Sequence, residues 1–275
     1  MEQKRIIAIN DISCFGKCSL AVATPILSAS GVECCPVPTA VLSTHTAFSG
    51  YTFRDLTADL IPIAEHWKEL KLDFNAIYSG YLGSKEQIKA VEKIIDMFPA
   101  DFVLVDPVMG DNGVLYDGFS YEFISEMKKL IKRADVIVPN VTEASLLTDT
   151  PFEKGIHTKE YILSLCEKLS AMSSAKIVIT GININNEEIG TAVFEENELT
   201  IIGREKFGVS YSGTGDVFAS TLASALILGK NLKTSAEIAS DFVTDCIKET
   251  KKTSGDRNYG VNFEPCLENL IKYLK

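Results

Sequence analysis

Short apolar segments alternate with longer amphipathic segments through the first two thirds of the chain. Runs rich in β-branched residues predict strands, whereas apolar residues spaced three and four apart predict helices. The predicted strands cover residues 6–10, 33–42, 74–79, 102–106, 136–138 and 176–180. The predicted helices cover residues 19–30, 55–70, 85–97, 121–131, 142–147 and 159–172. This alternation predicts a three-layer α/β fold, with a central, mostly parallel β-sheet flanked by helices.

The last third of the chain has a different pattern. Residues 190–194 and 199–202 predict a β-hairpin around an acidic turn. Three further helices are expected, at residues 217–228, 235–247 and 265–274. We find no internal repeat, low-complexity stretch or linker in the 275 residues, so we expect a single domain, residues 1–275.

Ligands on parallel α/β sheets bind beyond the carboxyl ends of the strands. We therefore expect the site in the turns that follow residues 10, 42, 79, 106, 138 and 180. The first of these is a polar turn at residues 11–16, which Asp11 begins.

The most informative of the candidate segments is Ser212-Gly213-Thr214-Gly215-Asp216, which leads into an apolar helix. Glycines let the backbone turn tightly and approach a ligand closely. A helix N-terminus offers unpaired N–H groups to an anion. Asp216 would then be placed to take a proton from a hydroxyl beside those groups, as phosphoryl transfer to an alcohol requires. A plain helix cap is the alternative role for Asp216.

Carboxylates and an amide follow two other strands. Asp106 and Asp111 surround one turn, and Asn140 and Glu143 stand three residues apart at a predicted helix start. Oxygen ligands of this kind suit Mg²⁺. An ordinary turn and a helix-capping pair are the alternative interpretations.

Two segments carry aromatic side chains beside small hydroxyl residues, Ser43-Thr44-His45-Thr46 and Ser79-Gly80-Tyr81-Leu82-Gly83. An imidazole and a phenol in such a setting can hold a polar aromatic substrate. His45 alone is more typical of a structural hydrogen-bonding residue. We expect His66 and His157 at the surface, because no polar group of residues surrounds them.

Charge and composition exclude several classes of protein. Lys and Arg number 27 against 37 Asp and Glu, a net charge of −10 that argues against nucleic-acid binding. Neither a P-loop nor a dinucleotide-binding glycine motif is present. No signal peptide or run of about 20 apolar residues is found, so no membrane association is expected. Seven cysteines, an odd number, predict reduced thiols in a cytoplasmic protein, without a disulfide or structural metal.

Taken together and in order, these segments resemble the pyridoxal kinase branch of the ribokinase-like superfamily. The resemblance extends over nearly the whole chain and is carried by Ala8-Ile9-Asn10-Asp11, Ser43-Thr44-His45-Thr46, Ser79-Gly80-Tyr81-Leu82-Gly83-Ser84, Asp106-Pro107-Val108-Met109-Gly110, Pro139-Asn140-x-x-Glu143 and Gly213-Thr214-Gly215-Asp216. The glycine-Asp motif alone is typical of ribokinase-like proteins in general. The His45 and Tyr81 segments are more specific to kinases of vitamin B6.

The resemblance implies ATP- and Mg²⁺-dependent phosphorylation of the 5′-hydroxymethyl group of pyridoxal, pyridoxine or pyridoxamine by a homodimer. It implies that Asp216 is the base and that the N–H groups of Gly213, Thr214 and Gly215 stabilise the transferring phosphoryl group. The implied pyridine pocket consists of Asp11, His45, Thr46, Ala47, Tyr81 and Asp216. The implied ATP site consists of Asp106, Asn140, Glu143, Thr180, Arg204, Lys206 and Phe207, with Asp106 and Glu143 arranging Mg²⁺ directly or through water.

Two positions depart from the family pattern. Many members have Ser where this chain has Asp11, and an ionised Asp only accepts hydrogen bonds. Asp11 would therefore favour a protonated pyridine nitrogen or the amine of pyridoxamine. Some relatives have Lys where this chain has Thr180, so Lys17, Arg204 or Lys206, or Mg²⁺ alone, would offset the phosphate charge.

Several alternatives stay open at this stage. A hydroxymethylpyrimidine kinase often has Cys in place of Asp216 and a Ser-Gly-Gly turn after its first strand, where this chain has residues 12–16. Dual specificity for both rings is a further possibility, and a sugar kinase is disfavoured because the chain does not begin with a glycine-rich sugar site. A non-catalytic vitamer- or nucleotide-binding protein of the same fold would have no need of Asp216.

Overall fold

The computed structural model describes residues 3–253 and 259–275. Its main sheet has nine strands within these residues, β1 (Arg5–Ser13), β2 (Glu33–Leu42), β3 (Phe53–Asp55), β4 (Ala76–Ser79), β5 (Phe102–Val105), β8 (Val136–Ile137), β9 (Lys176–Asn183), β10 (Glu188–Glu195) and β11 (Glu198–Glu205). A separate two-stranded pair is formed by β6 (Gly110–Asp111) and β7 (Val114–Leu115). The strand order in the main sheet is β11-β10-β9-β8-β5-β4-β1-β2-β3.

The central strands run parallel to one another. Parallel pairing connects β2, β1, β4, β5, β8 and β9, whereas β3, β10 and β11 are antiparallel additions at the two edges. The carboxyl ends of the six parallel strands therefore meet at one edge of the sheet, where such folds bind ligands. The expected mostly parallel sheet is confirmed.

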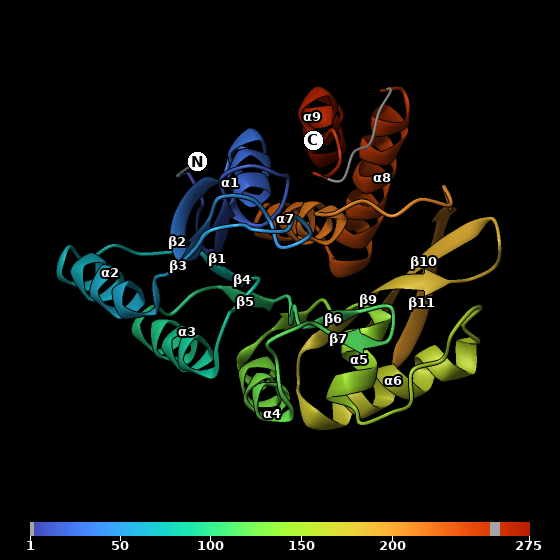
Figure 1. Cartoon of the computed structure of the whole chain (residues 1–275), viewed down its shortest axis with the longest axis horizontal. Coiled ribbons are helices and arrows are strands. Elements are labelled where there is room, and N and C mark those ends of the chain that lie inside the picture. Colours follow the sequence, from blue (N-terminus) through green and yellow to red (C-terminus); the bar gives the residue numbers. More distant parts are fainter. Residues whose placement is uncertain (1–2, 254–258) are drawn as a thin grey trace.

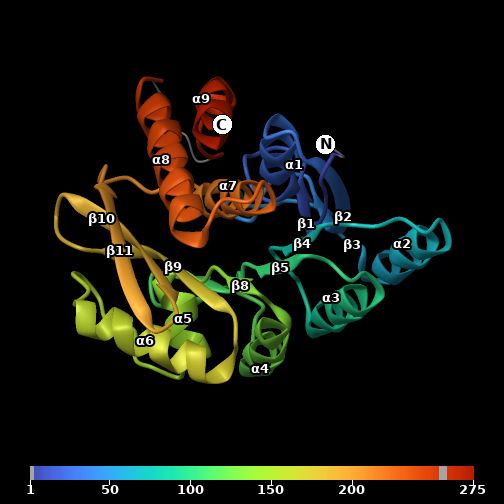
Figure 2. The ribbon, with the colours of Figure 1, turned by 180° about the vertical axis from the view of Figure 1, so that it is seen from behind.

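Helices cover both faces of the sheet, as Figure 1 and the reverse view in Figure 2 show. One face carries α1 (Leu20–Ala29), α7 (Thr214–Ile227), α8 (Leu232–Lys251) and α9 (Leu267–Leu274). The other face carries α2 (Thr57–Glu69), α3 (Lys85–Met97), α4 (Tyr121–Leu130), α5 (Val141–Leu147) and α6 (Lys159–Met172). The predicted three-layer α/β architecture is confirmed.

Strand β1 explains why the sheet is buried on both faces. Ile7 and Ile9 belong to the core beneath α2 to α6, and Ile6 and Ala8 belong to the core beneath α1 and α7. All four side chains are fully buried. Because successive side chains of a strand point to opposite faces, a continuous apolar run is what a two-sided core requires.

Strand β1 is longer than its apolar run predicts. It continues to Ser13, and its pairing with β2 shifts register between Asn10 and Ile12. Asp11 therefore lies within a strand and is buried, and the expectation of a turn over residues 11–13 is wrong. A β-bulge allows the strand to go on past polar residues, and such irregularities are common next to binding sites.

Other differences concern the ends of elements. Helix α7 begins at Thr214 rather than at Val217, because Gly213 serves as its N-cap. Residues 55–70 divide between β3 and α2, and the last predicted helix divides into a 3₁₀ turn, Glu264–Cys266, and α9. Short edge strands such as β3 carry too few apolar residues to be recognised in the sequence.

Predictions about individual side chains are tested as well. His66 is exposed, as expected, but His157 is only 7% exposed, so the expectation of a surface position is wrong. Its Nδ1 accepts from the Asn183 N–H at the end of β9 at 3.0 Å, and its Nε2 lies 3.1 Å from the carbonyl of Glu153, four residues earlier in the chain. All seven cysteines are free thiols. Within residues 3–253 and 259–275, no helix combines the length and apolar character needed to span a membrane.

The first turn of α3 offers a test of local stability. The Ser84 hydroxyl accepts a hydrogen bond from the Gln87 N–H at 3.2 Å and caps the helix. Ser84→Ala should lower the free energy of unfolding by about 1 kcal/mol, because an N–H of the first turn loses its acceptor. Urea unfolding followed by circular dichroism measures the change. Ser170→Ala, at an exposed position inside α6, is the matched control, and equal midpoints for both variants would contradict the prediction.

Candidate active site

The N-terminus of α7 is built around a glycine that no other residue could replace. Gly213 has a φ of +79°, a left-handed conformation that side-chain-bearing residues rarely adopt. A Cβ atom at this position would also overlap the carbonyl oxygen of Lys17. Helix α7 follows at once, and Thr214 and Gly215 occupy its first turn with Gly215 exposed. The first N–H groups of α7 are thereby presented at the sheet edge, as an anion site requires.

Asp216 stands in that first turn and is held by groups from the β1 segment. The Asn10 side-chain amide donates to the Asp216 carboxylate at 3.3 Å, and the Ser19 N–H is a second donor. Burial raises the pKa of Asp216 to about 6, against the opposing effect of these two donors. A carboxylate with that pKa is ionised at neutral pH and is still basic enough to accept a proton.

Two more carboxylates lie near Asp216. Asp106 follows β5 directly, and Glu143 stands in the first turn of α5. Burial raises the pKa of both side chains, and Glu143 and Asp216 raise that of Asp106 further through charge repulsion. Three separate connections thus bring acidic side chains to one edge of the sheet.

Asn140 and Glu143 form a capping box, which confirms the alternative considered for this pair. The Asn140 side chain accepts from the Glu143 N–H at 2.9 Å, and Glu143 Oε2 accepts from the Asn140 N–H at 2.8 Å. Glu143 Oε1 accepts from the Met109 N–H at 3.1 Å, and the Asn140 amide donates to the Gly110 carbonyl at 2.8 Å. The pair therefore joins the turn after β5 to the start of α5, so a structural role is certain whatever else it does.

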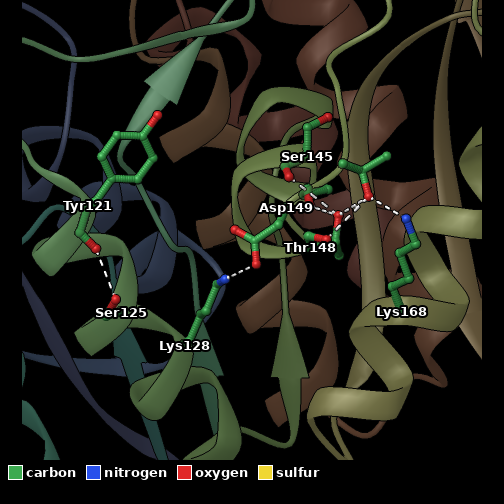
Figure 3. A network of polar contacts seen from close by, with 9 residues as sticks. Tyr121, Ser125, Lys128, Ser145, Thr148, Asp149 and Lys168 are labelled. Carbon is green, nitrogen blue, oxygen red and sulfur yellow. Dashed lines mark hydrogen bonds and ion pairs between the residues drawn. The ribbon is translucent and has the colours of Figure 1, made fainter.

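The far end of α5 is anchored by a second polar network, drawn in Figure 3. Lys128 of α4 donates to the Asp149 carboxylate at 2.6 Å. Lys168 of α6 donates to the Thr150 hydroxyl at 2.8 Å, and Thr148 donates to the same hydroxyl at 2.8 Å. These contacts fix the helix against both neighbours, which in turn fixes where Asn140 and Glu143 stand.

The donor set suits a divalent cation shared with a phosphate ligand. Within the part of the chain that the structure describes, no three His, Cys, Asp or Glu side chains form a complete metal site. Mg²⁺ needs no such site, because it is usually held by one or two carboxylates, several waters and substrate phosphates. Asp106 is buried among like charges that a cation would offset, whereas both oxygens of Glu143 already accept backbone N–H groups. Asp106 is thus the better candidate for direct contact, and Glu143 for contact through water.

The predicted substrate residues gather at the carboxyl ends of β1, β2 and β4. Asp11 is 5% exposed, burial raises its pKa, and it accepts from the Ser13 hydroxyl at 3.3 Å. His45 is buried, and its Nδ1 accepts from the Ala47 N–H at 3.3 Å. Thr46 and Ala47 are exposed, and Tyr81 is half-buried. The register of the parallel strands brings these segments to the edge where Asp216 lies.

An aromatic wall beside His45 was missed by sequence reasoning. Phe48 lies 4.9 Å from the His45 ring, between ring centroids, and Phe15 lies 5.9 Å from Phe48 and 5.5 Å from Tyr259. Phe15 is 53% exposed, so the wall faces outward. The rings of Phe15, Phe48 and Tyr259 come from three separate loops, so no local sequence pattern could have brought them together.

The candidate phosphate-binding side chains are placed differently. Lys17 Nζ pairs with the Glu264 carboxylate at 2.5 Å and the Asn262 amide oxygen at 3.1 Å, and its N–H donates to the Tyr259 carbonyl at 2.6 Å. Arg204 pairs with Asp241 of α8 at 2.6 Å. Both cations are thus bound to carboxylates of the C-terminal segment, which weakens their candidacy for phosphate.

Of the remaining residues expected at the ATP site, Thr180 lies within β9, and Lys206 and Phe207 directly follow β11. The Thr180 N–H donates to the Pro139 carbonyl at 3.0 Å and joins β9 to the start of α5. The Lys206 N–H donates to the Glu187 carbonyl at 2.8 Å. The ammonium groups of Lys248 and Lys251 lie over the Phe207 ring, with Nζ at 6.0 and 5.0 Å from the ring centroid. Their contact with ATP remains a prediction.

Solved structures and curated proteins resemble the chain over nearly its full length. A provisionally assigned phosphomethylpyrimidine kinase from Bacteroides thetaiotaomicron, crystallised with pyridoxal, is 37% identical, with a TM-score of 0.92 and coverage of 98% of this chain and 96% of its own. Pyridoxal kinase from Lactobacillus plantarum is 30% identical, with a TM-score of 0.91 and coverage of 99% and 98%. Pyridoxal kinase from Dictyostelium discoideum is 26% identical over 260 residues, which cover 86% of this chain and 81% of that protein.

These comparisons confirm the expected resemblance to pyridoxal kinases and the ribokinase-like fold. The family model for phosphomethylpyrimidine kinase matches residues 26–262. Since that match covers most of the chain, the protein belongs to the phosphomethylpyrimidine kinase family.

Proposed function

We propose that the chain is an ATP-dependent kinase that phosphorylates the 5′-hydroxymethyl group of pyridoxal, pyridoxine or pyridoxamine, the reaction of vitamin B6 salvage. The observation that carries the proposal is the Asp216 carboxylate, held by Asn10 in the first turn of a helix that starts at Gly213. A base beside exposed N–H groups is suited to phosphoryl transfer. The Bacteroides relative bound to pyridoxal supports the choice of acceptor.

In the proposed reaction, Asp216 accepts the proton of the 5′-hydroxyl as its oxygen attacks the γ-phosphorus of ATP. The new O–P bond forms as the bond to the β–γ bridging oxygen breaks, and ADP carries away that oxygen. The N–H groups of Gly213, Thr214 and Gly215 face the phosphoryl oxygens and offset their negative charge. Asp106, and Glu143 through water, would hold Mg²⁺, which offsets further phosphate charge when bound.

The acceptor ring would lie against the end of β1 and the segments after β2 and β4. Asp11 would accept a hydrogen bond from a protonated ring nitrogen or an amine, and the rings of His45 and Tyr81 would border the pyridine. Tyr81 is kept neutral because burial raises its pKa to about 12, so its hydroxyl can donate a hydrogen bond to the substrate.

The rival function is phosphorylation of a hydroxymethylpyrimidine or its phosphate, which the family's name favours. The thiamine biosynthetic bifunctional enzyme TH1 of Arabidopsis thaliana is 28% identical over 235 residues, although only 43% of that protein is covered. Against this rival, the chain has Asp at position 216 and no Ser-Gly-Gly turn after β1. The pyridine acceptor is therefore preferred.

We further infer that the protein is a cytoplasmic homodimer. Each of its two subunits would be a single kinase domain. The free state of all seven cysteines supports a reducing compartment. A single sheet that takes strands from both halves of the chain supports one domain. Light scattering of the purified protein would report the mass of the assembly.

Asp216→Asn is the direct test of the proposed base. With Mg²⁺-ATP and pyridoxal, kcat should fall about 10²- to 10⁴-fold, because the amide cannot take the hydroxyl proton. In the unaltered protein kcat/KM should rise as pH increases through about 6, because Asp216 must be ionised. A coupled assay of ADP release measures both effects.

The same assay, run with pyridoxal, pyridoxine, pyridoxamine and hydroxymethylpyrimidine, identifies the acceptor. Asp59→Asn, an exposed carboxylate of α2, is the control and should retain full activity. Turnover of hydroxymethylpyrimidine alone would show that the rival function is the correct one. An Asp216→Asn variant as active as the control would exclude Asp216 as the base.

Asp11→Ser tests the proposed preference for cationic acceptors. The buried Asp11 carboxylate gains most from a ligand that carries a positive charge. Replacement should therefore raise KM for pyridoxamine about tenfold relative to KM for pyridoxal, while KM for ATP stays the same. An unchanged ranking of the three vitamers would overturn this role for Asp11.

Asp106→Asn and Glu143→Gln separate the two proposed contributions to metal binding. Asp106→Asn should increase the Mg²⁺ concentration for half-maximal activity about tenfold or more, because a direct oxygen ligand loses its charge. Glu143→Gln should mainly lower the thermal stability, because this side chain closes the capping box. Titration of activity with Mg²⁺ and a melting curve for each variant measure the two effects. Equal dependence on Mg²⁺ in both variants would contradict the assignment of Asp106 as the direct ligand.

A further inference from the structure

Asn10 is a fully buried polar residue near the end of β1, and each of its side-chain atoms has a defined use. Its amide nitrogen donates to the Asp216 carboxylate at 3.3 Å. Its amide oxygen accepts from the Asp11 N–H at 3.0 Å and from the Tyr81 N–H at 2.9 Å. One side chain thus connects the proposed base with two residues of the proposed acceptor pocket.

Gly80 leaves the space that this arrangement needs. A Cβ atom at position 80 would overlap the Asn10 amide nitrogen, although the backbone there is not left-handed. The absence of a side chain at Gly80 is therefore explained by the close approach of Asn10 rather than by its own conformation. Gly83, three residues later, would place a Cβ atom no closer than 3.7 Å to any neighbour.

Apart from the Asn10 amide and the Ser19 N–H, few groups around Asp216 offer it a positive charge or a hydrogen-bond donor. The titratable side chains that act on it or are acted on by it come from β1, the segment before α1, β4, the turn after β5 and the segment before α4. They are Asp11, Cys18, Tyr78, Asp106 and Tyr116. Since these are acids rather than cations, the Asn10 amide and the Ser19 N–H carry the stabilisation of the carboxylate.

We propose that Asn10 is a positioning residue, which fixes the Asp216 carboxylate relative to the acceptor pocket through its bonds to Asp216 and Tyr81. The inference rests on the proposed function, in which Asp216 is the base. A side chain that holds both partners sets the distance between base and hydroxyl, and small errors in such distances cost large factors in rate. Asn10 would act through Asp216 and Tyr81 and would itself transfer no proton.

Asn10→Asp separates the two halves of this role. The substituted side chain keeps an oxygen for the Asp11 and Tyr81 N–H groups but turns a carboxylate oxygen toward Asp216 in place of the donor. We expect kcat at pH 7 to fall about 10- to 100-fold, with KM for pyridoxal changed less than threefold. Asn10→Ala removes all three bonds, so KM for pyridoxal should rise as well. A kcat for Asn10→Asp equal to that of the unaltered protein would overturn the proposal.

Gly80→Ala provides an independent test that leaves Asn10 in place. The added methyl group must displace the Asn10 amide, so kcat should again fall about tenfold, whereas Gly83→Ala on the same turn should not change it. Equal kcat values for Gly80→Ala and Gly83→Ala would contradict the proposed arrangement. Circular dichroism shows whether each variant is folded.

Titration of the Asp216 carboxyl by ¹³C NMR tests the same bond without any substrate. The resonance is assigned by its loss in Asp216→Asn. Asn10→Ala and Gly80→Ala should raise its pKa above the starting value of about 6, because the charged form loses a donor, and Gly83→Ala should leave it unchanged. An unshifted pKa in both variants would refute the role of Asn10. The proposed function fails separately, if the unaltered enzyme phosphorylates no B6 vitamer.

Discussion

The burial of three carboxylates at one sheet edge is the constraint on which the site depends. Asp106, Glu143 and Asp216 come from three different connections, yet each is close enough to another to affect its ionisation. Such an arrangement costs free energy unless donors or cations compensate it. The Asn10 amide and the capping box of α5 supply part of that compensation. The rest is left to what binds, so the free protein is prepared for a cation and for a hydroxyl that gives up a proton.

Most of the architecture follows from short-range patterns. The apolar runs of β1, β4 and β5 could be recognised because strands that are covered on both faces need apolar residues on both. Helices with an apolar stripe, such as α3, were equally clear. The bulge after Asn10 and the edge strand β3 were not, because the first depends on pairing with β2 and the second has only three residues.

The site was predictable to the extent that its residues stand at strand ends. Asp106 and Tyr81 were found in this way, since polar residues there have no role in a core, whereas Asp216 was found from the glycine motif that begins a helix. Asn10 was overlooked as a functional residue although a polar side chain at the end of an apolar run was visible, because its bonds to Asp216 and Tyr81 join segments about 206 and 71 residues away. His157 was misplaced because its partners, the Glu153 carbonyl and the Asn183 N–H, are backbone groups that no pattern of side chains identifies.

The contact between Lys17 and residues 259–264 has a consequence for how the enzyme folds during synthesis. The Lys17 carbonyl packs against Gly213, while its N–H and ammonium groups are bound by Tyr259, Asn262 and Glu264. The backbone that shapes the N-terminus of α7 is therefore completed by residues 259–264, which follow α8. A nascent chain could form most of the sheet during synthesis, yet it would acquire a finished phosphoryl site only after residues 259–264 had emerged. Phosphoryl transfer would then begin only once the segment after α8 had docked beside the first strand.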